Sequence, residues 1–68
     1  MQTLSENAKK FLARRPFRLG TIQGYRFFED PTHGDEGYLW AITPAGKLKN
    51  TREIEFDIDD LTYWIDNQ

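Results

Sequence analysis

The chain of 68 residues contains no cysteine, which excludes disulfide bonds and thiolate metal sites. No apolar run reaches ten residues, so the sequence predicts no membrane-spanning helix. The first ten residues lack the apolar stretch of a secretory signal, and we therefore expect a soluble, cytoplasmic protein. Without disulfides, a single domain over residues 1–68 needs a dense core or a partner subunit for its stability.

Groups that could carry catalysis are also few. Ser5 is the only serine and lies far in sequence from His33, the only histidine, so a hydrolase triad has little support. Gly20 and Gly24 fit neither the GxGxxG pattern nor the Walker pattern, which are the glycine-rich motifs whose backbone binds phosphates. A glycosidase needs a cleft between its two carboxylates, and a two-layer domain of this length leaves little room for one. We therefore expect no enzymatic activity, no cofactor and no bound metal.

The charges that are present separate along the chain. Residues 1–26 carry six basic residues and one acid, whereas residues 27–68 carry three basic residues and ten acids. The net charges of these parts are therefore +5 and −7, although the whole chain has a formal net charge of only −2. A folded chain of this kind can present two surfaces of opposite sign, each attracting a different class of partner.

A helix is predicted near the N-terminus. Thr3 and Glu6 match a capping box, with Ser5 as a competing cap. Pro16 disfavours helical backbone at the residue before it, so the helix should end near Arg15. Apolar residues at helical spacing would form its buried stripe, namely Leu4, Ala8, Phe11 and Leu12.

Short strand-like segments follow this helix. Apolar and aromatic residues between turn-forming residues predict strands at 17–23, 25–29, 38–43 and 47–50. Acidic and apolar residues then alternate strictly over residues 53–59, which predicts a short strand to about Phe56. A helical spacing takes over at about Ile58 and predicts a second helix to Asp66, with acids in its first turn.

These elements predict an α+β fold, in which an antiparallel sheet of three or four strands is flanked by an N-terminal and a C-terminal helix (α-β-β-β-(β)-α). We expect both helices to cover the same face of the sheet, in two layers. A small SH3-like open barrel with two helices is the alternative. The expected core consists of Leu4, Phe11, Leu12, Leu19, Ile22, Phe27, Trp40, Ile42, Ile54, Leu61 and Ile65.

An acidic row is the leading candidate for function, and it consists of Glu53, Glu55, Asp57, Asp59 and Asp60. On a strand, alternate carboxylates would lie about 6.8 Å apart on one face, close to the spacing of phosphates along one nucleic-acid strand. Such a row could dock a basic protein, mimic nucleic acid or only protect an edge strand from aggregation. It lacks the ordered glycine and final glutamate of a calcium-binding EF-hand loop. We favour a non-enzymatic protein-interaction module, such as a regulator, accessory protein or inhibitor.

A loop between two predicted strands is a second candidate contact region. His33, Asp35 and Glu36 offer side chains of the types that bind divalent metals. One histidine with two carboxylates is a weak metal signal, however, and the neighbouring glycines are typical of a solvated loop. The sequence therefore favours a contact loop here and no metal site.

A basic group supports the alternative function. Lys9, Lys10, Arg14, Arg15 and Arg18 could bind a nucleic-acid backbone, and the chain would then be a nucleic-acid-associated protein. The sequence pI of about 5.2 argues against this, because dedicated nucleic-acid domains are usually strongly basic. The same basic helix could also dock on the acidic strand of a second copy, which would make a homodimer.

Overall fold

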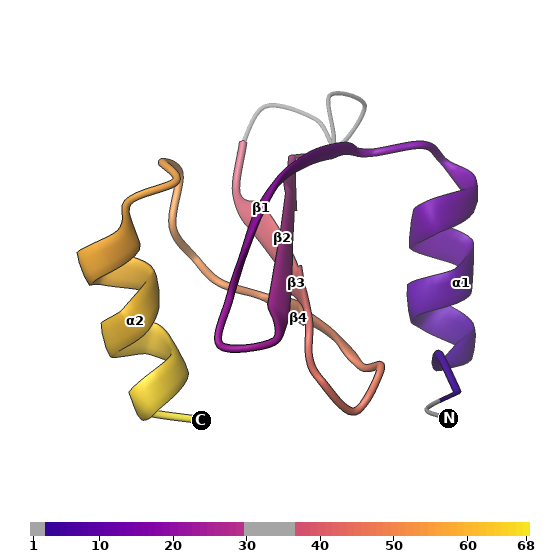
Figure 1. Ribbon diagram of the computed structural model, residues 1–68. Helices are drawn as coiled ribbons and strands as arrows, with labels where there is room; N and C mark the ends of the chain where they lie inside the picture. Colours follow the sequence, from indigo (N-terminus) through magenta and orange to yellow (C-terminus); the bar gives the residue numbers. More distant parts are fainter. Residues whose placement is uncertain (1–2, 30–36) are drawn as a thin grey trace.

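Four antiparallel strands form one open sheet in chain order, β1-β2-β3-β4, with one helix before it and one after it (Figure 1). The computed structural model describes residues 3–29 and 37–68. The elements are α1 (Glu6–Ala13), β1 (Phe17–Ile22), β2 (Tyr25–Glu29), β3 (Leu39–Ile42), β4 (Leu48–Asn50) and α2 (Ile58–Asp66). The predicted α+β fold is confirmed, and the barrel alternative is wrong because the sheet does not close.

The two helices pack on opposite faces of the sheet, with α1 on one side and α2 on the other (Figure 1). The expectation that both cover one face is therefore wrong. Strand β3 shows the reason, because successive side chains of a strand point to opposite faces. Trp40 and Ile42 belong to the cluster beneath α1, whereas Leu39 and Ala41 belong to the cluster beneath α2. Both faces of this strand are apolar, so each needs its own helix.

Each face has a small core. The cluster under α2 contains buried Phe27, Leu39, Ala41, Leu61 and Ile65. The cluster under α1 contains buried Ala8, Phe11, Phe28 and Ile42. Ten of the eleven predicted core residues are buried in these clusters or packed against them. The exception is Ile54, whose side chain is 65% exposed.

Local signals explain most of the element boundaries. Gln23 and Gly24 both have positive φ, at 51° and 83°, which is the backbone of the tight turn that joins twisted antiparallel strands. Asp57 caps α2, which begins at Ile58 as the helical spacing predicted. The cap of α1 is Ser5 and not Thr3, because the Ser5 hydroxyl accepts a hydrogen bond from the Ala8 N–H at 3.1 Å.

The strand predicted to end at about Phe56 does not form. Residues 51–57 instead leave the sheet after two backbone hydrogen bonds to Leu39, whose carbonyl accepts from the Thr51 N–H at 3.1 Å and whose N–H donates to the Glu53 carbonyl at 2.7 Å. Arg52 has φ of 63°, and this left-handed conformation breaks the extended backbone. The Asn50 side chain supports that turn, because its Oδ1 accepts from the Arg52 N–H at 2.9 Å.

Thr51 fastens this departing segment to the sheet, and its replacement is a first prediction. Its buried hydroxyl donates to the Leu39 carbonyl at 2.9 Å and accepts from the Glu53 N–H at 3.1 Å. Thr51→Val keeps the shape but removes both bonds, so we expect a loss of about 1–3 kcal/mol in the free energy of unfolding. Thr51→Ser retains the hydroxyl and should lose less. Urea denaturation compares them, and equal midpoints for the two variants would contradict this role.

Candidate functional site

The acidic residues do not form a straight row. Glu53 is half-buried beside β3, whereas Glu55, Asp57, Asp59 and Asp60 are exposed along the bend and the first turn of α2. Evenly spaced carboxylates on one strand face are therefore absent from residues 53–60, and mimicry of phosphate spacing loses its geometric basis. The acids remain concentrated on one side of the sheet, because α2 and the segment before it lie there (Figure 1).

Asp57 has a structural role of its own. Its Oδ1 accepts hydrogen bonds from the N–H groups of Asp59 at 2.9 Å and Asp60 at 3.2 Å. These bonds satisfy two of the donors that every helix leaves open at its N-terminus. Asp59 and Asp60 also place negative charge at the positive end of the helix dipole. Glu55, Asp59 and Asp60 are thus the carboxylates left for contact with another molecule.

Exposed apolar side chains alternate with these acids. Ile54 is 65% exposed and Ile58 is 62% exposed, and Tyr63 on α2 is also exposed. We call the six residues Ile54, Glu55, Asp57, Ile58, Asp59 and Asp60 the acidic–apolar surface. The alternating pattern of residues 53–59 predicts Ile54 in the core, because a strand at 53–56 would turn that side chain inward, and the sequence alone therefore does not reveal this surface.

Phe56 anchors the acidic–apolar surface to the sheet. Its ring packs edge-on against Phe27, with centroids 6.0 Å apart, and lies over Gly20 of β1. A Cβ at position 20 would come within 2.8 Å of the Phe56 ring, so the absence of a side chain there allows the close approach. The segment is therefore held at a defined place although it is neither helix nor strand.

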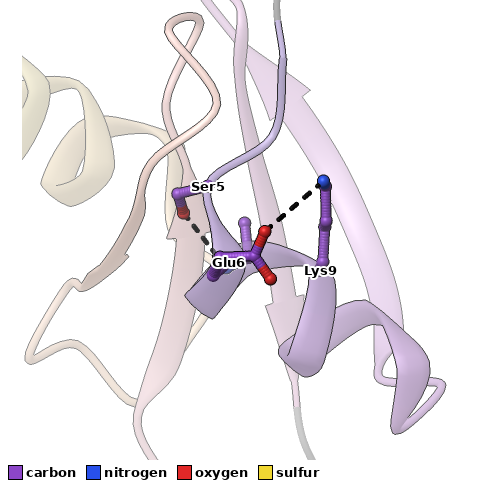
Figure 2. Close-up of polar contacts among 4 residues, drawn as sticks. Ser5, Glu6 and Lys9 are labelled. Carbon is purple, nitrogen blue, oxygen red and sulfur yellow. Dashed lines mark hydrogen bonds and ion pairs between the residues drawn. The ribbon is translucent and has the colours of Figure 1, made fainter.

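The basic residues gather on the other side of the sheet. Lys9 forms an ion pair with Glu6 within α1, with Nζ and Oε1 3.7 Å apart, next to the Ser5 cap (Figure 2). Both side chains are largely exposed, so this pair contributes little to stability. The Arg18 guanidinium donates to the Thr21 hydroxyl at 3.0 Å. Arg15 follows α1 with φ of 55° and is exposed.

Lys10 and Arg14 differ from the other predicted bases because they line a groove. The groove lies between α1 and the β3–β4 side of the sheet and has a volume of about 350 Å³. Its walls are Asn7, Lys10, Phe11, Arg14, Trp40 and Leu48. Trp40 and Leu48 were expected only as core and hairpin residues, and no local pattern in the sequence connects them to α1.

The structure thus places opposite charges on opposite faces of one thin molecule. Helix α2 carries Asp59, Asp60 and Asp66 and no base, whereas α1 carries Lys9 and Lys10 and one acid, Glu6 (Figure 1). The sheet and its two apolar cores lie between these helices (Figure 1). The charges of each helix therefore face solvent on their own side of the sheet.

The loop candidates His33, Asp35 and Glu36 lie outside the described residues. Among residues 3–29 and 37–68, no three histidine or carboxylate side chains come together as a possible metal site. No helix in the described part of the chain has the length and apolar character to cross a membrane. Comparison with protein-family models, with curated proteins and with solved structures finds no match.

Proposed function

We propose that this chain is a non-enzymatic protein-interaction module that binds a basic protein through the acidic–apolar surface. One observation carries the proposal: Ile54 and Ile58 are 65% and 62% exposed among carboxylates, while both cores of the domain are well buried. Apolar side chains supply most of the affinity at protein interfaces, and surrounding charges increase the association rate and specificity. A regulator, accessory protein or inhibitor would use such a surface.

The form of the surface also favours a folded partner over a small ligand. Its exposed residues follow a bend and the first turn of α2, whereas small ligands prefer concave pockets. Phe56 fixes the bend against β1 and β2, so little ordering is needed when a partner binds. A basic partner with an apolar cleft would therefore match both the charge and the exposed isoleucines.

Charge reversal on matched sites tests this proposal. The double variant Glu55→Lys and Asp60→Lys reverses two charges of the acidic–apolar surface and leaves the Asp57 cap intact. The control variant Lys10→Glu and Arg14→Glu reverses two charges on α1. We expect wild type and control to capture the same basic protein from a host lysate, and the acidic-surface variant to lose it.

The affinity of the purified partner is then measured for the purified wild type and for each variant. The acidic-surface variant should bind at least about tenfold more weakly, because like charges across an interface cost several kcal/mol. Ile58→Ser should weaken binding without changing its salt dependence. If the acidic-surface variant captured the same partner as wild type, or if the α1 control lost that partner equally, the proposal would be wrong. Circular dichroism of each variant confirms that it is folded.

A further inference from the structure

The groove beside α1 has the chemistry of a second binding site, independent of the acidic–apolar surface. Its floor is apolar and largely aromatic, formed by Phe11, Trp40 and Leu48. Phe11 is only 4% exposed and is held by edge-on packing against Phe28 at 5.7 Å and tilted packing against Trp40 at 6.0 Å. These contacts make the floor rigid, so the groove exists before any ligand arrives.

Polar groups line one side of this floor. Asn7, Lys10 and Arg14 follow at spacings of three and four residues, so they share one face of α1 and its cap. Neighbours at this spacing have Cβ atoms roughly 5–6 Å apart. Two cations one helical turn apart can each contact one of two successive phosphates, and the asparagine amide can both donate to and accept from a base edge. A guanidinium has five N–H donors, so Arg14 can bind a phosphate along with its other contacts.

We propose that this groove binds single-stranded nucleic acid. One unstacked base would enter the apolar floor, the flanking phosphates would contact Lys10 and Arg14, and Asn7 would contact the edge of that base. Aromatic side chains and cations along a groove are the usual means of binding single strands. Duplex bases are stacked and paired, so they do not reach a pocket of about 350 Å³.

The distribution of charge favours nucleic acid over an acidic peptide. Positive charge continues past the groove at Arg15 directly after α1 and at Lys9, whose ion pair with Glu6 is exposed and therefore weak. A polyanion that runs along α1 would meet these groups, whereas a peptide with one anionic anchor would use only the groove. The acids of α2 lie across the sheet, where screening reduces their repulsion of the bound strand.

Fluorescence anisotropy with a labelled single-stranded oligonucleotide, as DNA and as RNA, tests the groove in the full chain. At low salt we expect binding that weakens with salt, with a log–log slope of about −1.4 if two phosphates are contacted. Lys10→Ala with Arg14→Ala should weaken binding at least about tenfold and flatten that slope. The matched control Lys47→Ala with Lys49→Ala removes two cations outside the groove and should change binding less than about twofold.

A second measurement leaves the groove residues unchanged. In the variant Trp64→Phe, Trp40 is the only tryptophan, so its emission reports on the groove floor. We expect the oligonucleotide to quench this emission at the concentrations where anisotropy rises. The proposal is overturned if no binding occurs at low salt, if both double variants weaken it equally, or if Trp40 emission does not respond. Equal binding of the matching duplex, or tighter binding of an acidic aromatic peptide, would also overturn it.

Discussion

Replacing Phe27 with alanine should remove about 3–5 kcal/mol from the free energy of unfolding, the largest loss that we expect from one substitution. Phe27 is completely buried in the cluster under α2 and packs edge-on against both Phe56 and Trp64. A chain of 68 residues has a total stability of only about 3–10 kcal/mol, so this variant should lose about a third or more of its stability. Urea denaturation followed by circular dichroism measures the loss.

Phe17→Ala is the matched control, because it makes the same chemical change at a side chain that is 67% exposed. We expect it to alter stability by less than about 0.5 kcal/mol. Both helices should be lost together in Phe27→Ala, since small domains unfold cooperatively. A wild-type midpoint, or loss of α2 with α1 intact, would contradict the view that the two cores depend on one shared sheet.

Gly46→Ala should be the second most damaging substitution, at about 2–4 kcal/mol, from backbone strain together with overpacking. Gly46 has φ of 85° in the turn between β3 and β4. An added Cβ would lie 2.7 Å from the Thr3 carbonyl oxygen and 3.1 Å from the Leu4 Cα. These are backbone atoms, which do not move aside as a flexible side chain would. The same turn also accepts the Ser5 N–H at the Gly46 carbonyl, 2.9 Å away, so the entry to α1 would be displaced.

Gly37→Ala separates the cost of backbone strain from the cost of overpacking. Gly37 has a similar φ of 66°, but among residues 3–29 and 37–68 no atom beyond its chain neighbours lies within 4 Å of the position that its Cβ would occupy. It should therefore lose only the backbone term, about 1–2 kcal/mol. The difference between the two variants in thermal or urea denaturation is the cost of the contact with the N-terminal segment. Equal losses would show that this segment does not pack against the turn as described.

Patterns of residues adjacent in sequence predicted much of the fold. The 3.6-residue spacing from Leu4 to Leu12 marked α1, and the alternation in β3 assigned Trp40 and Leu39 to opposite faces. Both sets of side chains in β3 are apolar, which is consistent with two covered faces, but the alternation does not determine which segment covers each face. The expectation of two layers treats the sheet as having a single apolar face. It does not consider the two faces of β3 separately.

The error at residues 53–56 has a different origin. Strict alternation is consistent with a strand, but a strand also needs a neighbour with open hydrogen-bonding groups and an extended backbone that leads into it. The left-handed backbone at Arg52, which the Asn50 side chain supports, bends the chain, and the backbone pairing with β3 ends at Glu53 in the part of the chain that the structure describes. Ile54 therefore faces solvent and not the core, and its exposed side chain belongs to the acidic–apolar surface.

The sequence by itself determined the helices, the four paired strands and the separation of charge, because each depends on spacing, turn chemistry or composition within a short stretch of chain. Only the tertiary structure decided that α1 and α2 occupy opposite faces, and that Lys10, Arg14 and Trp40 line one groove. Those arrangements arise from packing between segments about 30 residues apart along the chain. Burial of apolar area is non-directional, so it selects neighbours by shape and volume, and these are properties that no local pattern contains.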